Sequence, residues 1–199
     1  MPLFDRKQDA WPSLADTPPL APGRDQKAPP AEAYPPIAAV VAEFGAEGIG
    51  TEEYQGQYRL IVPKAKFLDV MTFLKREPSL EFDYLLDVFG IDYLHFRGAR
   101  DRFAVVYALQ SHRHNHRLWV KVMLNEPDLT LPSVYALWHG ADWPEREVFD
   151  MFGVRFDGHP DLRRILCPAG FADHALRKDY PLTGKGERHD FVAVDRTTA

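Results

Sequence analysis

The stretch RFAVVYALQSHRHNHRLWVKVMLN, residues 102–125, decides the fold class. Its two ends, 102–111 and 117–125, are rich in β-branched and aromatic residues and have the length of strands. Between them the polar residues 112–116, HRHNH, supply a turn, so the stretch predicts a β-hairpin. A sheet built on this hairpin needs a second layer to bury its apolar side chains.

Helices and strands alternate on the N-terminal side of the hairpin. Residues 37–45 predict a short apolar helix, and residues 47–63 predict two short strands. Residues 64–77 predict an amphipathic helix, because apolar residues recur at positions i, i+4 and i+7. Leu68 and Val70 are expected to widen its apolar stripe.

The remaining predicted elements complete one domain over residues 37–185. A strand is expected within 84–94, a short helix over LPSVYALW at 131–138, and a second helix from Asp142. An irregular C-terminal segment follows. We therefore predict a two-layer α+β fold, with helices packed on one face of a mixed, largely antiparallel β-sheet.

The composition limits the class of protein. The 199 residues carry a net charge of −5, which does not suggest a general nucleic-acid binder. The single cysteine excludes an intrachain disulfide and cannot alone hold an iron–sulfur cluster. No apolar run approaches the roughly 20 residues of a membrane span, and the first ten residues lack a secretory signal pattern. We expect membrane contact only through a partner.

The two ends of the chain are set apart from this domain. Residues 1–36 hold nine of the 17 prolines and predict an extended or disordered arm. This arm is either a passive tail or a segment that wraps a neighbouring subunit. Residues 186–199 are predicted to be a C-terminal tail.

Two motifs suggest ligand sites, and each has a simpler explanation. GAEGIG, residues 45–50, has the wrong glycine order and context for a dinucleotide loop and fits a helix stop followed by a turn. His112, His114 and His116 alternate as metal ligands on a strand do. They lie where the hairpin turns, so a solvated loop is favoured.

Two further candidates concern nucleophilic and acid–base chemistry. Cys167 has no histidine base at a recognisable spacing and is expected to be a small buried residue. Glu145 and Glu147 are two apart on a helix and point in different directions, so they do not predict a carboxylate pair.

Residues 143–166, WPEREVFDMFGVRFDGHPDLRRIL, hold the densest mixture of acids, arginines and aromatics. Asp142 has the character of an N-cap, with Glu145 at capping-box spacing. Arg146 and Asp150 are expected to pair across one turn on the outer side of the helix. The charges of both signs, the turn residues and the exposed aromatics of this region are typical of a polar protein–protein interface.

A family resemblance rests on these residues. EREVFDMFGVRFDGHPDLRRIL, residues 145–166, and HALRKDYPLTG, residues 174–184, closely resemble the signature of the C-type subunit of NADH-quinone oxidoreductase, which is the 30-kDa subunit of respiratory complex I. The resemblance covers about residues 37–185. Asp173-His174-Ala175 stands where the family usually carries Gly-His-Pro, which loosens this loop.

The resemblance implies a scaffold with a mixed sheet that carries no catalytic residue. It implies a place in the peripheral arm, packed on the large 49-kDa (D-type) subunit and its neighbours, at the cytoplasmic face of the bacterial inner membrane or the mitochondrial matrix face. NADH, FMN, iron–sulfur clusters and quinone would belong to other subunits. The whole enzyme passes electrons from NADH to quinone and moves protons.

Ten charged residues of the signature are predicted to form the subunit interface, partly through contacts within the loop. They are Glu145, Arg146, Glu147, Asp150, His159, Asp161, Arg163, Arg164, Arg177 and Lys178. One alternative is the equivalent subunit of a related membrane-bound hydrogenase or of a ferredoxin-dependent plastid-type complex. Another is an independent enzyme that uses the histidines of 112–116 or the helix 145–150.

Overall fold

The computed structural model describes residues 34–54, 56–168 and 170–186. In chain order its elements are α1 (Pro35–Phe44), β1 (Gly50–Tyr54), β2 (Gln57–Ile61), the 3₁₀ turn η2 (Lys64–Lys66), α2 (Phe67–Arg76), β3 (Tyr84–Asp92), β4 (Phe103–Ser111), β5 (His116–Leu124), β6 (Thr130–Pro132), the 3₁₀ turn η3 (His139–Ala141), α3 (Asp142–Phe152) and β7 (Arg155–Asp157). The α+β prediction is confirmed.

The main sheet has five strands in the order β1-β2-β5-β4-β3. The pairing of β2 with β5 is parallel, and the other three pairings are antiparallel. The predicted hairpin is β4–β5, which closes at the pair Ser111 and His116. The expectation of a mixed, largely antiparallel sheet is therefore confirmed.

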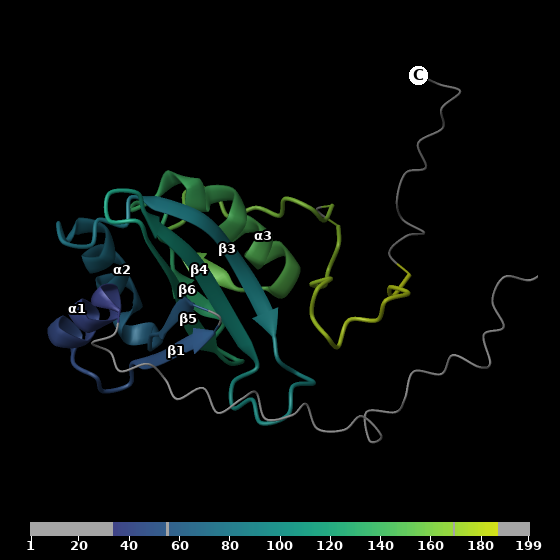
Figure 1. The fold of residues 1–199 in the computed structure, drawn as a ribbon. Coiled ribbons are helices and arrows are strands. Elements are labelled where there is room, and N and C mark those ends of the chain that lie inside the picture. The colour runs from purple at the N-terminus through teal and green to yellow at the C-terminus, as the bar shows by residue number, and fades with distance from the viewer. Residues whose placement is uncertain (1–33, 55, 169, 187–199) are drawn as a thin grey trace, which may run out of the picture.

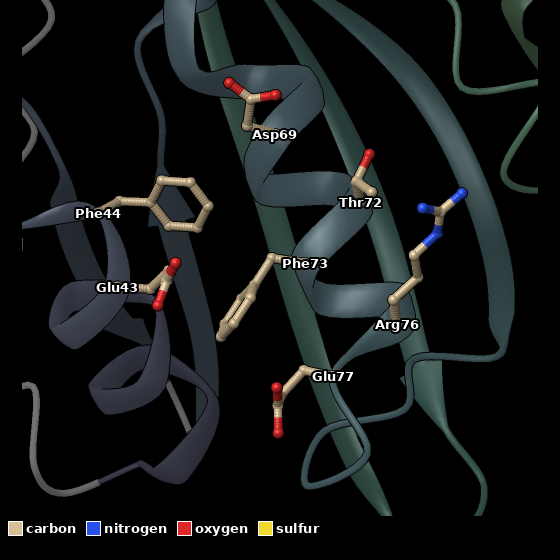
Figure 2. A pocket seen from close by; sticks show the side chains of 7 residues that line it. All are labelled: Glu43, Phe44, Asp69, Thr72, Phe73, Arg76 and Glu77. Carbon is tan, nitrogen blue, oxygen red and sulfur yellow. The ribbon is translucent and has the colours of Figure 1, made fainter.

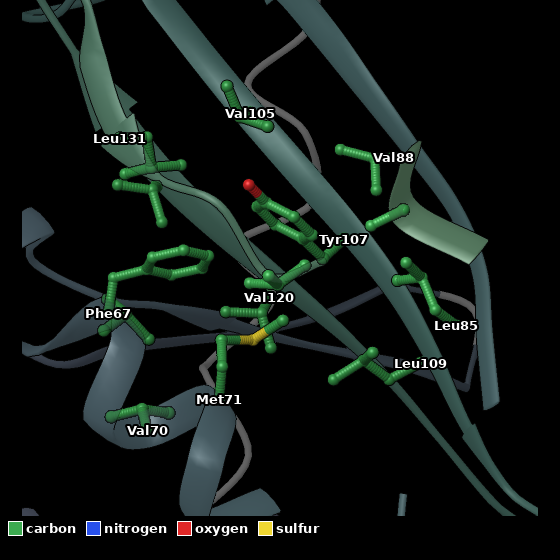
Figure 3. Packing of buried hydrophobic residues seen from close by; sticks show 14 of the residues in the cluster. Phe67, Val70, Met71, Leu85, Val88, Val105, Tyr107, Leu109, Val120 and Leu131 are labelled. Atoms are coloured by element: carbon green, nitrogen blue, oxygen red, sulfur yellow. The ribbon is translucent and has the colours of Figure 1, made fainter. Parts of the chain in front are cut away.

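The helices cover one face of this sheet. Figure 1 shows β3 and β4 crossing the centre of the molecule, with α1 and α2 to the left in this view and α3 to the right. All three helices pack on the same face of the sheet. The core lies between the helices and the strands, and Figure 3 shows Tyr107 of β4 in its middle. The Tyr107 ring packs against Phe67 of α2, with ring centroids 5.0 Å apart.

The close packing of α3 on β3 depends on Gly90. A Cβ atom at this position would lie 2.5 Å from Cδ2 of the Phe152 ring at the end of α3. The absence of a side chain therefore lets the helix approach the strand.

Two predictions about the elements differ from the structure, and one pair of strands was not predicted. Residues 131–138 do not form a helix, since Leu131 lies in β6 and only one turn follows, with Leu137 N–H and Trp138 N–H donating to the carbonyl of Val134. The two-stranded parallel sheet of β6 and β7 was not predicted. Leu68 is 40% exposed and lies outside the buried stripe of α2, whereas Val70 belongs to it.

Most of the predicted arm and tail lies outside the described residues. Of residues 1–36, only Tyr34, Pro35 and Pro36 are described, and the two prolines form the first turn of α1. Of residues 186–199, only Gly186 is described. Over the described part of the chain, no helix has the length and apolar character needed to cross a membrane.

Candidate functional site

The candidate site consists of α3 and the irregular segment after it, which Figure 1 shows extending beyond the sheet. The predicted capping box is wrong. Asp142 is the first residue of α3, Ala141 holds the cap position, and no side chain caps the helix. The helix ends at Gly153, which adopts a left-handed φ of 83°.

Glu145 points into the protein. Its side chain is fully buried, and its carboxyl oxygens accept hydrogen bonds from Ser133 Oγ at 2.6 Å and Val134 N–H at 2.9 Å. Burial raises the pKa of Glu145 to about 7, with a smaller contribution from Asp142, while the two hydrogen bonds oppose the rise. Glu145 therefore joins α3 to the turn that follows β6.

Asp150 is the main anchor of the segment after α3. One of its oxygens, Oδ2, accepts the N–H groups of Ile165, Leu166 and Cys167 at 3.0, 2.8 and 2.8 Å. The other, Oδ1, lies 2.9 Å from Nη1 of Arg164. Burial raises the pKa of Asp150, but these donors outweigh it and lower the pKa overall. A buried, ionised carboxylate thus holds three consecutive backbone amides.

The predicted pairing of Arg146 with Asp150 is therefore wrong. The side chain of Arg146 instead donates to the backbone carbonyls of Arg163 at 3.0 Å and Arg164 at 3.4 Å. Both residues of the expected pair bind the same stretch of the following segment. They act on the backbone of that stretch and not on each other.

Asp92, at the end of β3, is a second buried anchor. It accepts the N–H of Lys178 at 2.8 Å and that of Leu94 at 2.9 Å. It also pairs with Arg102, which reaches Asp179 at 2.8 Å. Burial raises the pKa of Asp92, but the Arg102 and backbone hydrogen bonds lower it overall. The far end of the segment is thereby fixed to the sheet.

Three further side chains bind backbone carbonyls of α3. Arg177 donates to Phe152 O at 2.7 Å and pairs with Glu126 at 2.9 Å. The ring of His174 contacts Asp150 O at 2.9 Å. Basic groups are favoured at the carbonyl end of a helix, so both help the segment turn back on α3. The ring of His159 contacts the carbonyl of Asp142, at the other end.

The ten predicted interface residues differ in the contacts that they make within the chain. Seven of them make hydrogen bonds or ion pairs that hold this region together: Glu145, Arg146, Asp150, His159, Arg164, Arg177 and, through its backbone, Lys178. Arg163 pairs with Asp161 at the surface, at 2.7 Å. Glu147 and the side chain of Lys178 are exposed, and neither forms an ion pair within the described residues.

Exposed aromatics were expected in this region, and Trp143 is one of them, but the exposed leucines of the region were missed in the sequence. Trp143, Leu166 and Leu182 are 69, 63 and 101% exposed. Residue type alone does not show whether such a side chain is in the core, so nothing in the sequence distinguished them. Together with the exposed charges they form the C-terminal surface: Trp143, Glu147, Arg163, Leu166, Lys178 and Leu182.

The three histidines of the hairpin do not converge on one point, although the rings of His114 and His116 stack with their centroids 6.0 Å apart. His112 pairs with Asp83 at 2.9 Å, and the ring of His114 contacts Pro78 O at 3.0 Å. His116 packs edge-on against Tyr34. Among the described residues, no group of three or more histidine, cysteine, aspartate or glutamate side chains is arranged to hold a metal ion.

Cys167 and the glutamate pair lack the geometry of a catalytic centre. Cys167 is half-buried, and burial together with the nearby Asp150 carboxylate raises the pKa of its thiol, which disfavours the nucleophilic thiolate. Glu145 is buried whereas Glu147 is exposed, so their side chains do not share one site.

A groove of about 330 Å³ lies between α1 and α2 (Figure 2). Phe44 and Phe73 meet edge to face in it, with ring centroids 5.6 Å apart. The groove is also lined by the acidic residues Glu43, Asp69 and Glu77 and by Arg76, whose guanidinium points away from the two rings in Figure 2. This groove belongs to other elements than the C-terminal surface.

Comparisons with known proteins give a consistent result. A sequence model of the family described as the 30-kDa subunit of respiratory-chain NADH dehydrogenase matches residues 60–186. The C-type subunit of the NADH-quinone oxidoreductase of Burkholderia multivorans is 43% identical over 158 residues, which is 77% of this chain and 79% of the relative. The same subunit of Cupriavidus metallidurans is 47% identical over 143 residues, 69% of this chain and 72% of the relative.

Two solved structures share the fold. A trypsin-resistant fragment of Nqo5 is 37% identical, with a TM-score of 0.58, and the match covers 64% of this chain and 99% of the fragment. A chain of an archaeal membrane-bound sulfane sulfur reductase is 22% identical, with a TM-score of 0.62, over 80% of this chain and 91% of that chain. The second likeness concerns the fold alone.

Proposed function

The chain belongs to the family of the 30-kDa subunit of respiratory-chain NADH dehydrogenase, and from this premise we propose that it is a structural subunit that docks through its C-terminal surface on the large 49-kDa subunit of its complex. The complex transfers electrons from NADH to quinone. The role of this chain is to present a shaped surface to its neighbours.

One observation carries the proposal: buried carboxylates hold an irregular segment whose apolar side chains are exposed. Asp150 and Asp92 bind backbone amides of residues 165–167 and 178. The segment is thus fixed in shape while Leu166 and Leu182 remain in contact with solvent. Apolar side chains held rigidly at a surface and surrounded by charges are typical of binding hot spots.

The proposal assigns the redox chemistry to other subunits. An iron–sulfur cluster requires several cysteine thiolates, and this chain has only Cys167, whose amide and surroundings already serve Asp150. NADH, FMN, the clusters and quinone would accordingly be bound elsewhere in the complex. Association with the cytoplasmic face of a bacterial inner membrane, or the matrix face of a mitochondrial one, would follow from assembly.

A second candidate is the matching subunit of a related membrane complex, such as a hydrogenase or a ferredoxin-dependent plastid-type enzyme. This candidate is kept because a chain of the membrane-bound sulfane sulfur reductase, another membrane complex, has the same fold. The two candidates predict different co-purifying subunits.

The test compares two exposed leucines. A tagged Leu166→Asp chain should recover the 49-kDa subunit from solubilised membranes at least about tenfold less well than the wild type, because loss of a hot spot costs about 2 kcal/mol or more. Leu68→Asp on α2 is the matched control, since Leu68 is also exposed, and its recovery should be unchanged.

Electron transfer per assembled complex is the second measurement. It should be the same in both variants and in the wild type, because only assembly is affected. Normal recovery of the 49-kDa subunit with Leu166→Asp would contradict docking through the C-terminal surface. A variant that assembles normally and fails in electron transfer would contradict the assignment of a structural role.

A further inference from the structure

The face of the main sheet opposite the helices contains a groove along β4. On this face β4 presents Ala104, Val106 and Ala108, because their neighbours Phe103, Val105 and Tyr107 belong to the core. The flanking strands present larger side chains. By register, Ala108 lies beside Trp119 of β5, and Val106 lies between Lys121 of β5 and Phe89 of β3. Small residues between large ones form the floor of a shallow groove, and the flanking side chains leave Ala104, Val106 and Ala108 only 1, 4 and 5% exposed.

A hollow of about 210 Å³ marks the centre of this outer groove. It is lined by Arg59, Phe89, Ile91, Tyr93, Val106, Trp119 and Lys121. Its sides are formed by β3 and β5, whose backbones are separated by β4 alone and so lie roughly 9.5 Å apart, while the rings of Phe89 and Trp119 meet across β4. The described helices pack on the other face of the sheet and leave the groove open.

The lining indicates the chemistry of the occupant. Phe89 and Trp119 meet edge to face at 5.6 Å, and the Lys121 ammonium lies 5.0 Å from the centroid of the Tyr93 ring. Grooves lined by aromatic rings bind proline-rich segments, because such segments are already extended and lose little entropy on binding. The Lys121 ammonium, which has no carboxylate partner among the described residues, adds a preference for an acidic residue in the ligand.

This chain contains a segment of that composition. Residues 12–33 hold six prolines and three acidic residues, Asp16, Asp25 and Glu32. As an extended polyproline chain, 22 residues would span roughly 68 Å, several times the length of the groove. Reach therefore does not limit binding.

This segment joins the fold at Tyr34, which packs on the helix-covered face of the sheet beside the start of β5, so the segment has to pass around the sheet to reach the groove. The Tyr34 hydroxyl donates to Arg117 O at 2.8 Å and accepts the N–H of Arg117 at 3.0 Å, and the Tyr34 ring stacks on Tyr58. Arg117 is two residues before Trp119 on β5, about 7 Å along the strand. Because 22 residues are long enough for this path, a segment tethered at Tyr34 has an effective concentration of up to about the millimolar range at the groove.

We propose that residues 12–33 of this chain bind in the outer groove along β4, with an acidic residue facing Lys121. This inference is independent of the docking of the C-terminal surface, because it concerns another face and other residues. Its failure would leave the proposed function unaffected.

Zero-length carbodiimide cross-linking of the full chain tests it. This reagent joins an amine to a carboxylate that touches it, so digestion and mass spectrometry should find Lys121 joined to Asp16, Asp25 or Glu32. The exposed amine of Lys178 is the internal control. Its links to the same carboxylates should be at least fivefold rarer. Links from Lys121 that are no more frequent than those from Lys178 would overturn the proposal.

Two full-length variants and an isotope mixture complete the test. Trp119→Ala removes a wall of the groove and should abolish the Lys121 links. Replacing the six prolines of 12–33 by serine leaves the folded part untouched and should reduce the links at least fivefold; unchanged links would overturn the proposal. In a mixture of ¹⁴N and ¹⁵N chains the links should lie within one chain, and links between chains would identify a second copy as the occupant.

Discussion

The helix–sheet body and the segment after β7 are held together in different ways. In the body, the side chains of α1, α2, α3 and the strands form one continuous apolar core. In the segment, none of the described residues from 158 to 186 is buried as a whole residue. Buried carboxylates of the body bind its backbone amides, and its partly buried Leu162, Cys167 and Ala175 pack against the core of the body. A chain can thus give a defined shape to a surface that has no core of its own.

The largest effect is expected in the body. Phe67→Ala empties a fully buried position beside Tyr107 and should lower the free energy of unfolding by about 3–5 kcal/mol. Denaturant titration should show this loss for the whole cooperative transition. Leu68→Ala, at an exposed position next to it, should change the value by less than about 0.5 kcal/mol. Equal losses would contradict the described packing of α2.

Asp150→Ala should act on the segment instead. It leaves Arg164 and three amides without their buried acceptor, and losing one member of such a pair typically costs about 3–5 kcal/mol. Hydrogen exchange should accelerate at residues 163–168 with little change in β4. Asp161→Ala, at an exposed ion pair, should change neither region. Uniform acceleration across the chain would show that segment and body unfold together.

Glu145→Gln tests the burial of Glu145 through the pH dependence of the protein's stability. Folded Glu145 keeps its proton up to about pH 7, whereas the unfolded group loses it near its ordinary value of 4.5. The wild type therefore loses stability as pH rises from about 4.5 to 7, in total about 3 kcal/mol. The glutamine variant lacks this loss, so thermal unfolding should show its stability relative to the wild type increasing between pH 5 and 8. Parallel pH profiles would contradict the burial of Glu145.

The smallest effect is expected where α3 meets the sheet. Gly90→Ala places a methyl group against the Phe152 ring and should destabilise the fold by about 1–3 kcal/mol, as overpacking does. Gly140→Ala is the control, because nothing lies within 4 Å of its added Cβ. Chemical denaturation measures both. A neutral Gly90→Ala would mean that α3 shifts freely on β3.

Periodicity explains what the sequence predicted of the fold. The β4–β5 hairpin and α2 repeat their apolar residues with the periods of a strand and a helix, and both were found. The prediction of a helix over residues 131–138 was wrong because Leu131 and Val134 have helical spacing, whereas Leu131 pairs with Phe156 of β7 in the structure. That partner is distant in the sequence, and strands of three residues carry no readable period.

The residue types of the site were predictable, but their directions were not. Arg146 and Asp150 have the spacing of a surface ion pair, and this local rule was applied to them. Asp150 instead turns inward, because the amides of residues 165–167 meet it there. Three amides aimed at one point are a property of the folded backbone and leave no pattern in the side chains. The contacts of the exposed residues with a partner remain a prediction.

The bond between Asp92 and the amide of Lys178 has a consequence for biosynthesis. The two residues are separated by 86 positions, so a ribosome that adds 5–20 residues per second delivers Lys178 roughly 4–17 s after Asp92. During that interval β3 and β4 have time to pair, while the carboxylate of Asp92 stays without this donor. The nascent protein therefore forms its sheet first and its C-terminal surface only at the end of translation.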